Sequence, residues 1–391
     1  MNPEQSKNGR ITIGHTIHAF RDGGMERGLL NLINYGDRDH FRHVILCLTD
    51  AGAFAKLVSS PNCHIVELKK REGNDWRLPW RIAQEARRHA VDVLHARGWP
   101  AMVETAMGAR LAHVYSTVYT FHGKTFEDLQ GVSFKRRWIQ RAAIRCYQRV
   151  LTLNGCMRAD LAAECSLAES LIQIVTNGVD AEIFRPGADA KELRGVFGLP
   201  TDRIILGNVA RLDPVKNHEV ILRALARISN RDRRPFFLLV GDGPHRATLQ
   251  QVIGQLGLTP DVRLFGYSDR IPALLNCMDV YVQSSFYEGF SNTVLEAMAC
   301  GVPVLATDVG GTRDVLQEGR EGLFFRPGDV EKLTALILRL AGDVRLRRAL
   351  GECGRRRVEE FFTVQSMVQK YESIYRELGC QGNRSETSAS K

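Results

Sequence analysis

The sequence lacks the features of a membrane-spanning or secreted protein. Its 391 residues contain no long apolar run, whereas a spanning helix needs about 18 such residues in succession. The first residues include Glu4, Lys7 and Arg10 and do not form the apolar core of a signal peptide. We therefore expect a cytoplasmic protein.

The sequence also offers little for disulfide or metal chemistry. The nine cysteines are scattered, odd in number and never arranged as Cys-x-x-Cys, so we expect them to be reduced packing residues. One acidic pair, Asp37-Arg38-Asp39, has the spacing of a metal-binding Asp-x-Asp motif. It lies between a predicted helix and a predicted strand, so we reject it as a metal site and expect a reaction without a metal or cofactor.

Length and hydrophobic pattern predict two domains of the α/β class. A chain of 391 residues exceeds the roughly 250–300 residues at which single cores stop growing. Short apolar runs alternate with amphipathic stretches from end to end, which is typical of parallel sheets covered by helices. We place the domains at 1–186 and 187–362, because 177–187 is rich in turn residues. A helix over 363–380 is expected to pack back on the first domain, and 381–391 to be disordered.

The predicted elements follow from these patterns. In the first domain, strands are expected at 11–15, 43–48, 64–68, 92–95, 113–120, 149–152 and 171–175, and helices at 26–35, 80–89, 100–109, 134–148 and 155–164. In the second, strands are expected at 204–209, 236–241, 262–265, 280–283, 304–307 and 322–325, and helices include 188–197, 344–362 and 364–378.

Positive charge is concentrated in the first half. The net charge of +9 divides as +6 over residues 1–186 and +3 over the remainder, and the densest stretch is Phe134–Arg149. Helical spacing would place Arg137, Arg141, Arg145 and Arg149 in one stripe. Such a stripe is either a solvated face or a surface that meets anionic lipid or a pyrophosphate acceptor. No nucleic-acid-binding motif is present, so nucleic acid is not an expected partner.

The clearest chemical signal lies in residues 287–301, which resemble a loop followed by a helix. Glu288 falls on the loop and Glu296 inside the helix, so spacing alone does not make them a close acid–base pair. The helix N-terminus offers free N–H groups to an anion, and the carboxylates suit sugar and ribose hydroxyls. A nucleotide sugar therefore fits this stretch. The further candidate contacts are Gly289, Phe290, Ser291, Asn292 and Thr293.

This Glu-x7-Glu segment resembles that of glycosyltransferase family 4, whose members are retaining enzymes of the two-domain GT-B fold. Residues 207–217 resemble the family's diphosphate-clamping strand and loop, which implies that Arg211 and Lys216 contact the donor phosphates. Arg offers a planar donor fork and Lys a compact charge, and both would offset charge on a departing nucleoside diphosphate. The resemblance also implies that Glu288 orients sugar hydroxyls and Glu296 the ribose.

Three glycine-containing turns extend the resemblance. Gly241 opens a turn after a strand, and Gly266-Tyr267 lies where family members contact the base. Gly310-Gly311 resembles the family's turn near the phosphates, where the lack of a side chain permits close backbone approach.

Two segments of the first half resemble the family as well. Asp22-Gly23-Gly24-Met25-Glu26-Arg27 resembles a loop that faces the diphosphate and the acceptor, which implies roles for Gly23 and Gly24. Residues 119–123 resemble the segment with the family's catalytic-site histidine, which implies that His122 contacts the donor sugar. Taken singly, such glycines and histidines are more often structural. His15, His18 and His95 also end or follow strands and remain unassigned candidates.

Together these segments predict a retaining glycosyltransferase. The resemblance implies a UDP- or GDP-sugar donor and a glycan or polyprenyl-pyrophosphate-linked acceptor. Within the family, the short strings resemble bacterial exopolysaccharide and lipopolysaccharide sugar transferases of the PEP-CTERM-associated type. The alternatives are a GT-B sugar-nucleotide epimerase, a phosphorylase-like enzyme, for which no pyridoxal-phosphate lysine is evident, and a non-catalytic nucleotide-sugar-binding or membrane-surface scaffold.

Overall fold

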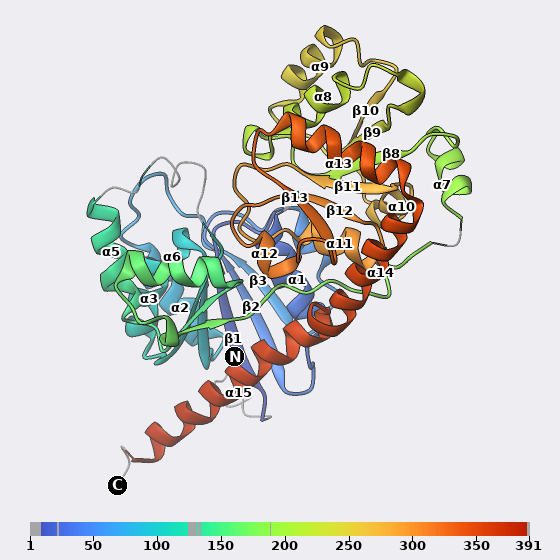
Figure 1. The fold of residues 1–391 in the computed structure, drawn as a ribbon. Helices are drawn as coiled ribbons and strands as arrows, with labels where there is room; N and C mark the ends of the chain where they lie inside the picture. Colours follow the sequence, from blue (N-terminus) through green and yellow to red (C-terminus); the bar gives the residue numbers. More distant parts are fainter. Residues whose placement is uncertain (1–8, 22, 124–130, 132–133, 188, 389–391) are drawn as a thin grey trace. The chain divides into compact units, whose positions relative to one another are not determined.

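The computed structural model describes residues 9–21, 23–123, 131, 134–187 and 189–388. The chain forms two compact units (Figure 1). Unit 1 comprises Met1–Asn177 with Val364–Lys391, and unit 2 comprises Gly178–Thr363. Each unit carries its own parallel sheet, so the α/β class predicted from the sequence is confirmed. Asp22 of the Gly-Gly loop, Ala188 at the start of a predicted helix, and tail residues 389–391 lie outside the described residues.

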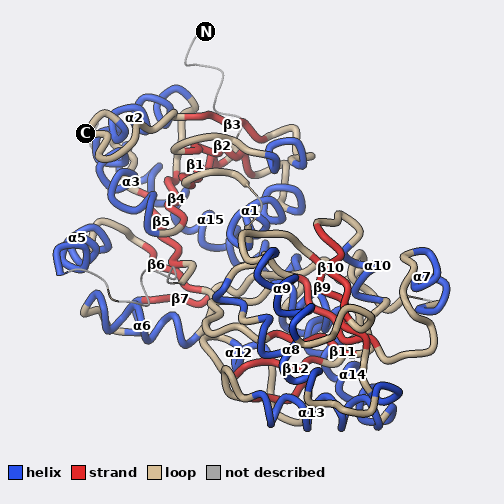
Figure 2. Tube along the Cα trace, turned by 90° about the horizontal axis from the view of Figure 1, so that it is seen from above, coloured by secondary structure: helices blue, strands red, loops and turns tan. Residues whose placement is uncertain are grey.

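Unit 1 contains a seven-stranded sheet in the order β3-β2-β1-β4-β5-β6-β7. Figure 2 shows these strands as a continuous row. The order changes direction between β1 and β4, so the carboxyl ends of these two strands form a topological switch point, where ligands of α/β proteins bind. The strands are β1 Ile11–Ile17, β2 Phe41–Cys47, β3 Cys63–Glu67, β4 Val93–Arg97, β5 Ser116–Phe121, β6 Arg149–Thr152 and β7 Ile172–Ile174.

Helices cover both faces of this sheet. In Figure 2, α1 and α15 lie on one side of the strands and α2, α3 and α5 on the other. The buried side of α15 packs on β1, β4 and β5 through residues such as Met367, Ile374 and Leu378. The helices are α1 Gly24–Tyr35, α2 Leu78–Arg88, α3 Trp99–Ala112, α5 Phe134–Ile144, α6 Gly155–Cys165 and α15 Val364–Ser388, with short 3-10 turns η2 Ala53–Leu57 and η3 Glu169–Leu171.

Unit 2 contains a six-stranded sheet in the order β10-β9-β8-β11-β12-β13. Its central strands are buried on both faces, and β9 is accordingly a continuous apolar run, Phe-Phe-Leu-Leu-Val. The strands are β8 Ile205–Val209, β9 Phe236–Val240, β10 Val262–Gly266, β11 Val280–Gln283, β12 Val304–Thr307 and β13 Gly322–Phe325.

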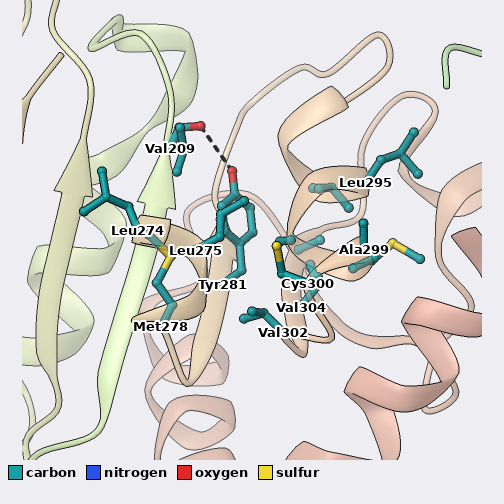
Figure 3. Close-up of a cluster of buried hydrophobic side chains, with 14 of the residues drawn as sticks. Val209, Leu274, Leu275, Met278, Tyr281, Leu295, Ala299, Cys300, Val302 and Val304 are labelled. Carbon is teal, nitrogen blue, oxygen red and sulfur yellow. Dashed lines mark hydrogen bonds between the residues drawn. The ribbon is translucent and has the colours of Figure 1, made fainter. Parts of the chain in front are cut away.

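Two hydrophobic clusters cover the faces of this second sheet. One includes α10 and α11 and the other α8, α9 and α13. The first surrounds Tyr281 of β11, drawn in Figure 3. The helices of unit 2 are α7 Ala190–Val196, α8 His218–Ala226, α9 Arg246–Gln255, α10 Ile271–Asn276, α11 Asn292–Ala299, α12 Thr312–Val315, α13 Val330–Gly342 and α14 Val344–Phe361, with η4 Pro214–Lys216 and η5 Arg231–Arg233.

The division between the units differs from the predicted boundary at residue 186. Residues 178–186 belong to unit 2 because their contacts are there. The amide of Val179 donates to the carbonyl oxygen of Phe362 at 2.9 Å, and Phe184 packs against a core cluster of unit 2. A turn-rich sequence marks a break in regular structure, but tertiary contacts decide which unit a connecting segment joins.

Two predictions of where a helix ends were also wrong. The predicted arginine stripe does not form, because α5 ends at Ile144 and Arg149 is the first residue of β6. Arg149 instead forms an ion pair with Glu377 of α15. At the C-terminus, α15 continues to Ser388, whereas the predicted helix ended at residue 378. The predicted disorder of 381–391 stays a prediction. Extending an established helix adds one hydrogen bond per residue without a new nucleation cost, and a polar composition does not stop it.

Candidate functional site

Glu288 lies in the loop between β11 and α11, and its carboxylate is the centre of a hydrogen-bond network in unit 2. Its Oε2 accepts from Lys216 Nζ at 2.8 Å and from Ser285 Oγ at 3.0 Å, with Gln283 Nε2 at 3.4 Å. The Glu288 side chain is 12% exposed. Loss of one partner of such a partly buried pair leaves a charge without compensation, so the two residues depend on one another.

A second set of polar residues fixes this network to the sheet. Gln283 Oε1 accepts from the amide of Thr307 at 3.1 Å. The Thr307 hydroxyl donates to the carbonyl oxygen of Ser285 at 2.8 Å. Both Gln283 and Thr307 are the last residues of their strands. The carboxyl ends of β11 and β12 therefore hold the donors that orient Glu288.

Lys216 ends the short turn η4, and the residues behind it are buried. Its carbonyl oxygen accepts from Ser284 Oγ at 2.8 Å. His218 Nε2 lies 3.0 Å from Asn208 Oδ1, and Asn208 Nδ2 donates to the carbonyl oxygen of Val282. Burial, followed by the charge of Lys216, lowers the pKa of His218 to about 3. A neutral imidazole thus supports the lysine loop.

Two glycine turns approach the loops of this site more closely than any side chain would allow. Gly310 has φ +51°, and a Cβ there would lie 1.9 Å from the carbonyl oxygen of Glu288. That same carbonyl accepts from the amide of Gly311 at 3.2 Å. Gly241 has φ +129°, and a Cβ there would lie 2.0 Å from the carbonyl oxygen of Ala210. The glycines are therefore needed for backbone packing beside Glu288 and Arg211.

The start of α11 is held by local and tertiary hydrogen bonds. Ser291 is its N-cap, and Ser291 Oγ accepts from the amide of Val294 at 3.4 Å. The hydroxyl of Tyr281 lies 2.8 Å from Thr293 Oγ1 and 3.2 Å from the carbonyl oxygen of Val209, the second contact being drawn in Figure 3. Burial raises the pKa of Tyr281. The buried tyrosine thereby ties the N-terminus of α11 to the end of β8.

The other predicted residues of unit 2 lie around these loops. Arg211 is exposed and forms no hydrogen bond or ion pair within the described part of the chain. Tyr267 is 71% exposed beside Gly266, which has φ +91°. The ring of Phe290 is half-buried and packs against the core near Phe362, with ring centres 6.4 Å apart. Gly289, Asn292 and Glu296 are half-buried on the loop and helix.

In unit 1, Gly23 is the N-cap of α1, and Gly24 begins the helix. The backbone of Gly23 is extended, with φ −168°, which any residue can adopt, but a Cβ there would lie 2.2 Å from Glu26 Oε2, so that side chain would have to move. His122 directly follows β5, and neither of its buried ring nitrogens has a hydrogen-bond partner among the described residues. Burial, followed by the charge of Arg97, lowers the pKa of His122 to about 3. The imidazole is therefore neutral at ordinary pH.

The other strand-end histidines have different surroundings. His15 Nε2 lies 3.0 Å from His43 Nδ1. His95 lies 2.7 Å from the hydroxyl of Tyr375 through Nδ1 and 2.7 Å from Thr120 Oγ1 through Nε2. Both are fully buried, and both rings lie against Tyr375 of α15, with ring centres 6.1 and 5.9 Å away. His18 is exposed.

Comparison with known proteins assigns the family. Residues 22–183 match the family model Glycosyltransferase Family 4, and residues 189–357 match Glycosyl transferases group 1. The putative glycosyltransferase EpsD of Bacillus subtilis is 32% identical over 301 residues, which cover 73% of this chain and 77% of EpsD. This chain belongs to glycosyltransferase family 4. An Escherichia coli relative, the UDP-Gal:alpha-D-GlcNAc-diphosphoundecaprenol alpha-1,3-galactosyltransferase, is 26% identical over 73% of this chain and 75% of its own.

Solved structures of other glycosyltransferases share the fold of this family 4 member. A glycosyltransferase from Rickettsia africae aligns with a TM-score of 0.83 at 20% identity, covering 94% of this chain and 98% of its own. Anabaena HepE in complex with UDP aligns with a TM-score of 0.80 at 22% identity, covering 94% and 100%. The GT-B fold predicted from the sequence is confirmed.

In the described part of this glycosyltransferase, no helix has both the length and the apolar character needed to cross a bilayer.

Asp37, from the rejected Asp-x-Asp motif, has a local structural role, because its Oδ1 accepts from the amides of Asp39 and His40. Its Oδ2 lies 2.7 Å from His40 Nδ1. This carboxylate closes a turn before β2.

Proposed function

We propose that the protein transfers a sugar, with retention of anomeric configuration, from a UDP- or GDP-sugar to a glycan or polyprenyl-diphosphate-linked acceptor. One observation carries this proposal: a cation and a carboxylate, Lys216 and Glu288, lie 2.8 Å apart at the carboxyl edge of the sheet in unit 2. The lysine suits a donor phosphate and the carboxylate suits sugar hydroxyls. The names of the relatives support it, since one uses UDP-Gal and one was solved with UDP.

In this mechanism the bond between the anomeric carbon and the diphosphate oxygen breaks, and its electron pair leaves with the nucleoside diphosphate. Lys216 and Arg211 stabilise the negative charge on the departing phosphate. The acceptor hydroxyl attacks the same face of the sugar and gives its proton to a phosphate oxygen of the leaving group. Glu288 accepts hydrogen bonds from the sugar hydroxyls, and Glu296 from the ribose.

His122 takes a supporting part in this mechanism. A neutral imidazole presents one N–H donor and one acceptor nitrogen, and both nitrogens of His122 lack a partner among the described residues. It can therefore bind a sugar hydroxyl without carrying a charge. With two cations for the diphosphate, the proposed transfer needs no metal ion.

The proposal is tested by offering the purified protein labelled UDP-, GDP- and ADP-sugars with a glycan and a polyprenyl-diphosphate acceptor. We expect one sugar nucleotide to yield labelled acceptor, and the anomeric proton coupling of the product to match that of the donor. An inverted product would contradict retention. Interconversion of the nucleotide sugar without transfer would favour an epimerase, and binding without turnover a scaffold.

The acceptor would bring this enzyme to a membrane surface, and α5 offers a suitable face. Phe134 and Trp138 are 80% and 65% exposed, and Lys135 between them is exposed. Aromatic and basic side chains together favour the interface of anionic lipid. We expect Trp138→Ala to weaken sedimentation with anionic vesicles, whereas Leu171→Ala, which changes another exposed apolar residue, should leave it unchanged. Equal sedimentation of both variants would argue against α5. The cytoplasmic location stays a prediction.

A further inference from the structure

Arg97 is a buried cation that has no carboxylate partner among the residues that the structure describes. It is the last residue of β4 and is 1% exposed. Its Nε and Nη2 atoms are buried without a hydrogen-bond partner among the described residues. Burial of an uncompensated charge costs several kcal/mol. Because burial of this charge lowers the stability of the folded state, packing alone does not explain why arginine occupies this position.

Two other unsatisfied groups lie close to this guanidinium. Arg97 Cζ lies 5.2 Å from the ring centre of Tyr371 on α15. The Tyr371 hydroxyl is buried and has no hydrogen-bond partner in the described chain. Arg97 pairs in register with Thr120 of β5, and His122 follows two residues later. Both nitrogens of His122 are likewise unsatisfied. Arginine, histidine and tyrosine thus leave hydrogen-bonding capacity unused in one part of unit 1.

The position of this group favours a ligand over a structural defect. β1 and β4 are neighbours at the switch point of the sheet, where α/β proteins bind their ligands. The helix α3 begins at Trp99, just after Arg97, and its N-cap Gly98 supplies no side-chain cap. The positive end of the helix dipole therefore reaches the same edge of the sheet. His122 and Gly123 at this edge are half-buried, so they lie nearer to the surface than Arg97.

We propose that Arg97, His122 and Tyr371 form a phosphate-binding site in unit 1 that receives a phosphate of the acceptor. The two unsatisfied nitrogens of Arg97 form one edge of its fork, which matches a pair of phosphate oxygens. The hydroxyl of Tyr371 and one nitrogen of His122 add donors. The donor diphosphate already has Lys216 of unit 2 as its proposed partner. The assignment to the acceptor rests on the proposed function, but the phosphate site itself does not.

The first experiment measures phosphate binding without any transfer. It uses the Lys216→Met protein, so that phosphate binding at the proposed donor site is weakened by the loss of one of its two cations. It follows thermal unfolding with inorganic phosphate or pyrophosphate against chloride of equal ionic strength. All four tryptophans lie in unit 1, so their fluorescence reports this unit. We expect phosphate at about 10 mM to raise the unfolding midpoint by mass action and Arg97→Met to abolish the rise. Arg110→Met, which changes an exposed arginine of α3, should retain it.

The Arg97→Met substitution also has an expected effect on the stability of the protein without phosphate. Without phosphate, Arg97→Met should unfold at the same or a higher temperature, because the cost of burying an unpaired charge is removed. If Arg97→Met does not fold, phosphate binding is measured in Arg97→Lys instead, because lysine keeps the positive charge but lacks the paired donors of the guanidinium. We then expect roughly tenfold weaker phosphate binding. An unchanged phosphate response in the Arg97 variant, or no response before substitution, would overturn the site.

The second experiment assigns the ligand, using the active enzyme with Lys216 intact. Arg97→Met should raise the KM for a diphosphate-linked acceptor by roughly tenfold or more, with a smaller change in kcat, and leave the KM of the donor unchanged. An unchanged acceptor KM, with phosphate binding lost, would overturn the assignment to the acceptor. Failure of the proposed function would appear differently, as a lack of transfer by the unsubstituted protein, and the phosphate titration would remain interpretable.

Discussion

At the scale of single residues, the Lys216–Glu288 pair has the greatest chemical consequence. Lys216 Nζ and Ser285 Oγ both donate to Glu288 Oε2, and Gln283 links that carboxylate to β12 through Thr307. The carboxylate is therefore fixed before any sugar hydroxyl reaches it. Preorganised groups of this kind lose little energy to rearrangement during a reaction.

The first prediction concerns the charge of Glu288. Glu288→Gln should lower the transfer rate at saturating donor by roughly 10²–10³-fold, because the amide neither balances Lys216 nor accepts sugar hydroxyls at both oxygens. The matched control is Glu331→Gln, which changes a 78% exposed carboxylate in the same unit and should leave transfer unchanged. Glu288→Gln within a few-fold of the parent enzyme would contradict a role for this carboxylate.

Sequence motifs predicted part of this site, and the reason for the limit is physical. Lys216 and Glu288 stand in recognisable strings, and they lie together in the structure. Gln283, Ser285 and Thr307 carry no motif of their own, since their contacts cross from β11 to β12. Pairing between strands has no local signal in the sequence. A lone arginine such as Arg97 gave no signal either, because burial of its side chain is a tertiary property.

At the scale of elements, α15 is part of unit 1 although it follows unit 2 in the chain. Its buried residues include Ile374, which is 2% exposed and packs with apolar residues of β1, β4 and β5. Its Tyr375 hydroxyl also meets His95. The helix therefore completes the core on one face of the first sheet.

The second prediction tests this packing. Ile374→Ala should lower the free energy of unfolding of unit 1 by about 2–5 kcal/mol, because the cavity adds to the lost apolar burial. Denaturant titration followed by tryptophan fluorescence measures it, since the tryptophans are confined to this unit. Ser373→Ala, at an exposed neighbouring position, should change it little. A shift below about 1 kcal/mol would mean that α15 is not part of this core.

The sequence predicted most elements because their apolar runs are strong. The bounds of β6, β11, β12 and β13 are those expected from the pattern. The end of α5 was missed because the residues after Ile144 leave the helix, and the amide of Tyr147 bonds to the Ile144 carbonyl oxygen in a turn. The basic composition of Phe134–Arg149 contains no residue pattern that marks the end of a helix. Composition also underestimated the length of α15.

At the scale of the whole molecule, buried histidines make stability depend on pH. Burial is the first cause of the low pKa of His43, about 4, and of His122 and His218, about 3. In the unfolded chain their pKa returns to about 6.5. As the pH falls below that value the unfolded state gains protons that the folded state does not, so the folded state loses stability.

The third prediction follows from this sign. Stability should be fully present above about pH 6.5 and fall steadily between pH 6.5 and 4, with His43 alone accounting for roughly 3 kcal/mol at the lower limit. Urea titrations across this range measure it through the tryptophans of unit 1. His43→Gln should make the slope shallower, because glutamine does not titrate. A stability that stays constant down to pH 4.5 would show that these imidazoles are accessible to protons.

The most direct test of a donor site at the Lys216–Glu288 pair is to measure, by calorimetry, the affinity for the nucleoside diphosphate that the preferred donor releases. It compares the parent protein with Lys216→Met and with Lys332→Met, a change to an exposed lysine in the same unit. Because Lys216 is proposed to hold the donor phosphates, we predict at least roughly tenfold weaker binding for Lys216→Met and unchanged binding for Lys332→Met. Equal affinity in all three proteins would contradict a donor site at the Lys216–Glu288 pair.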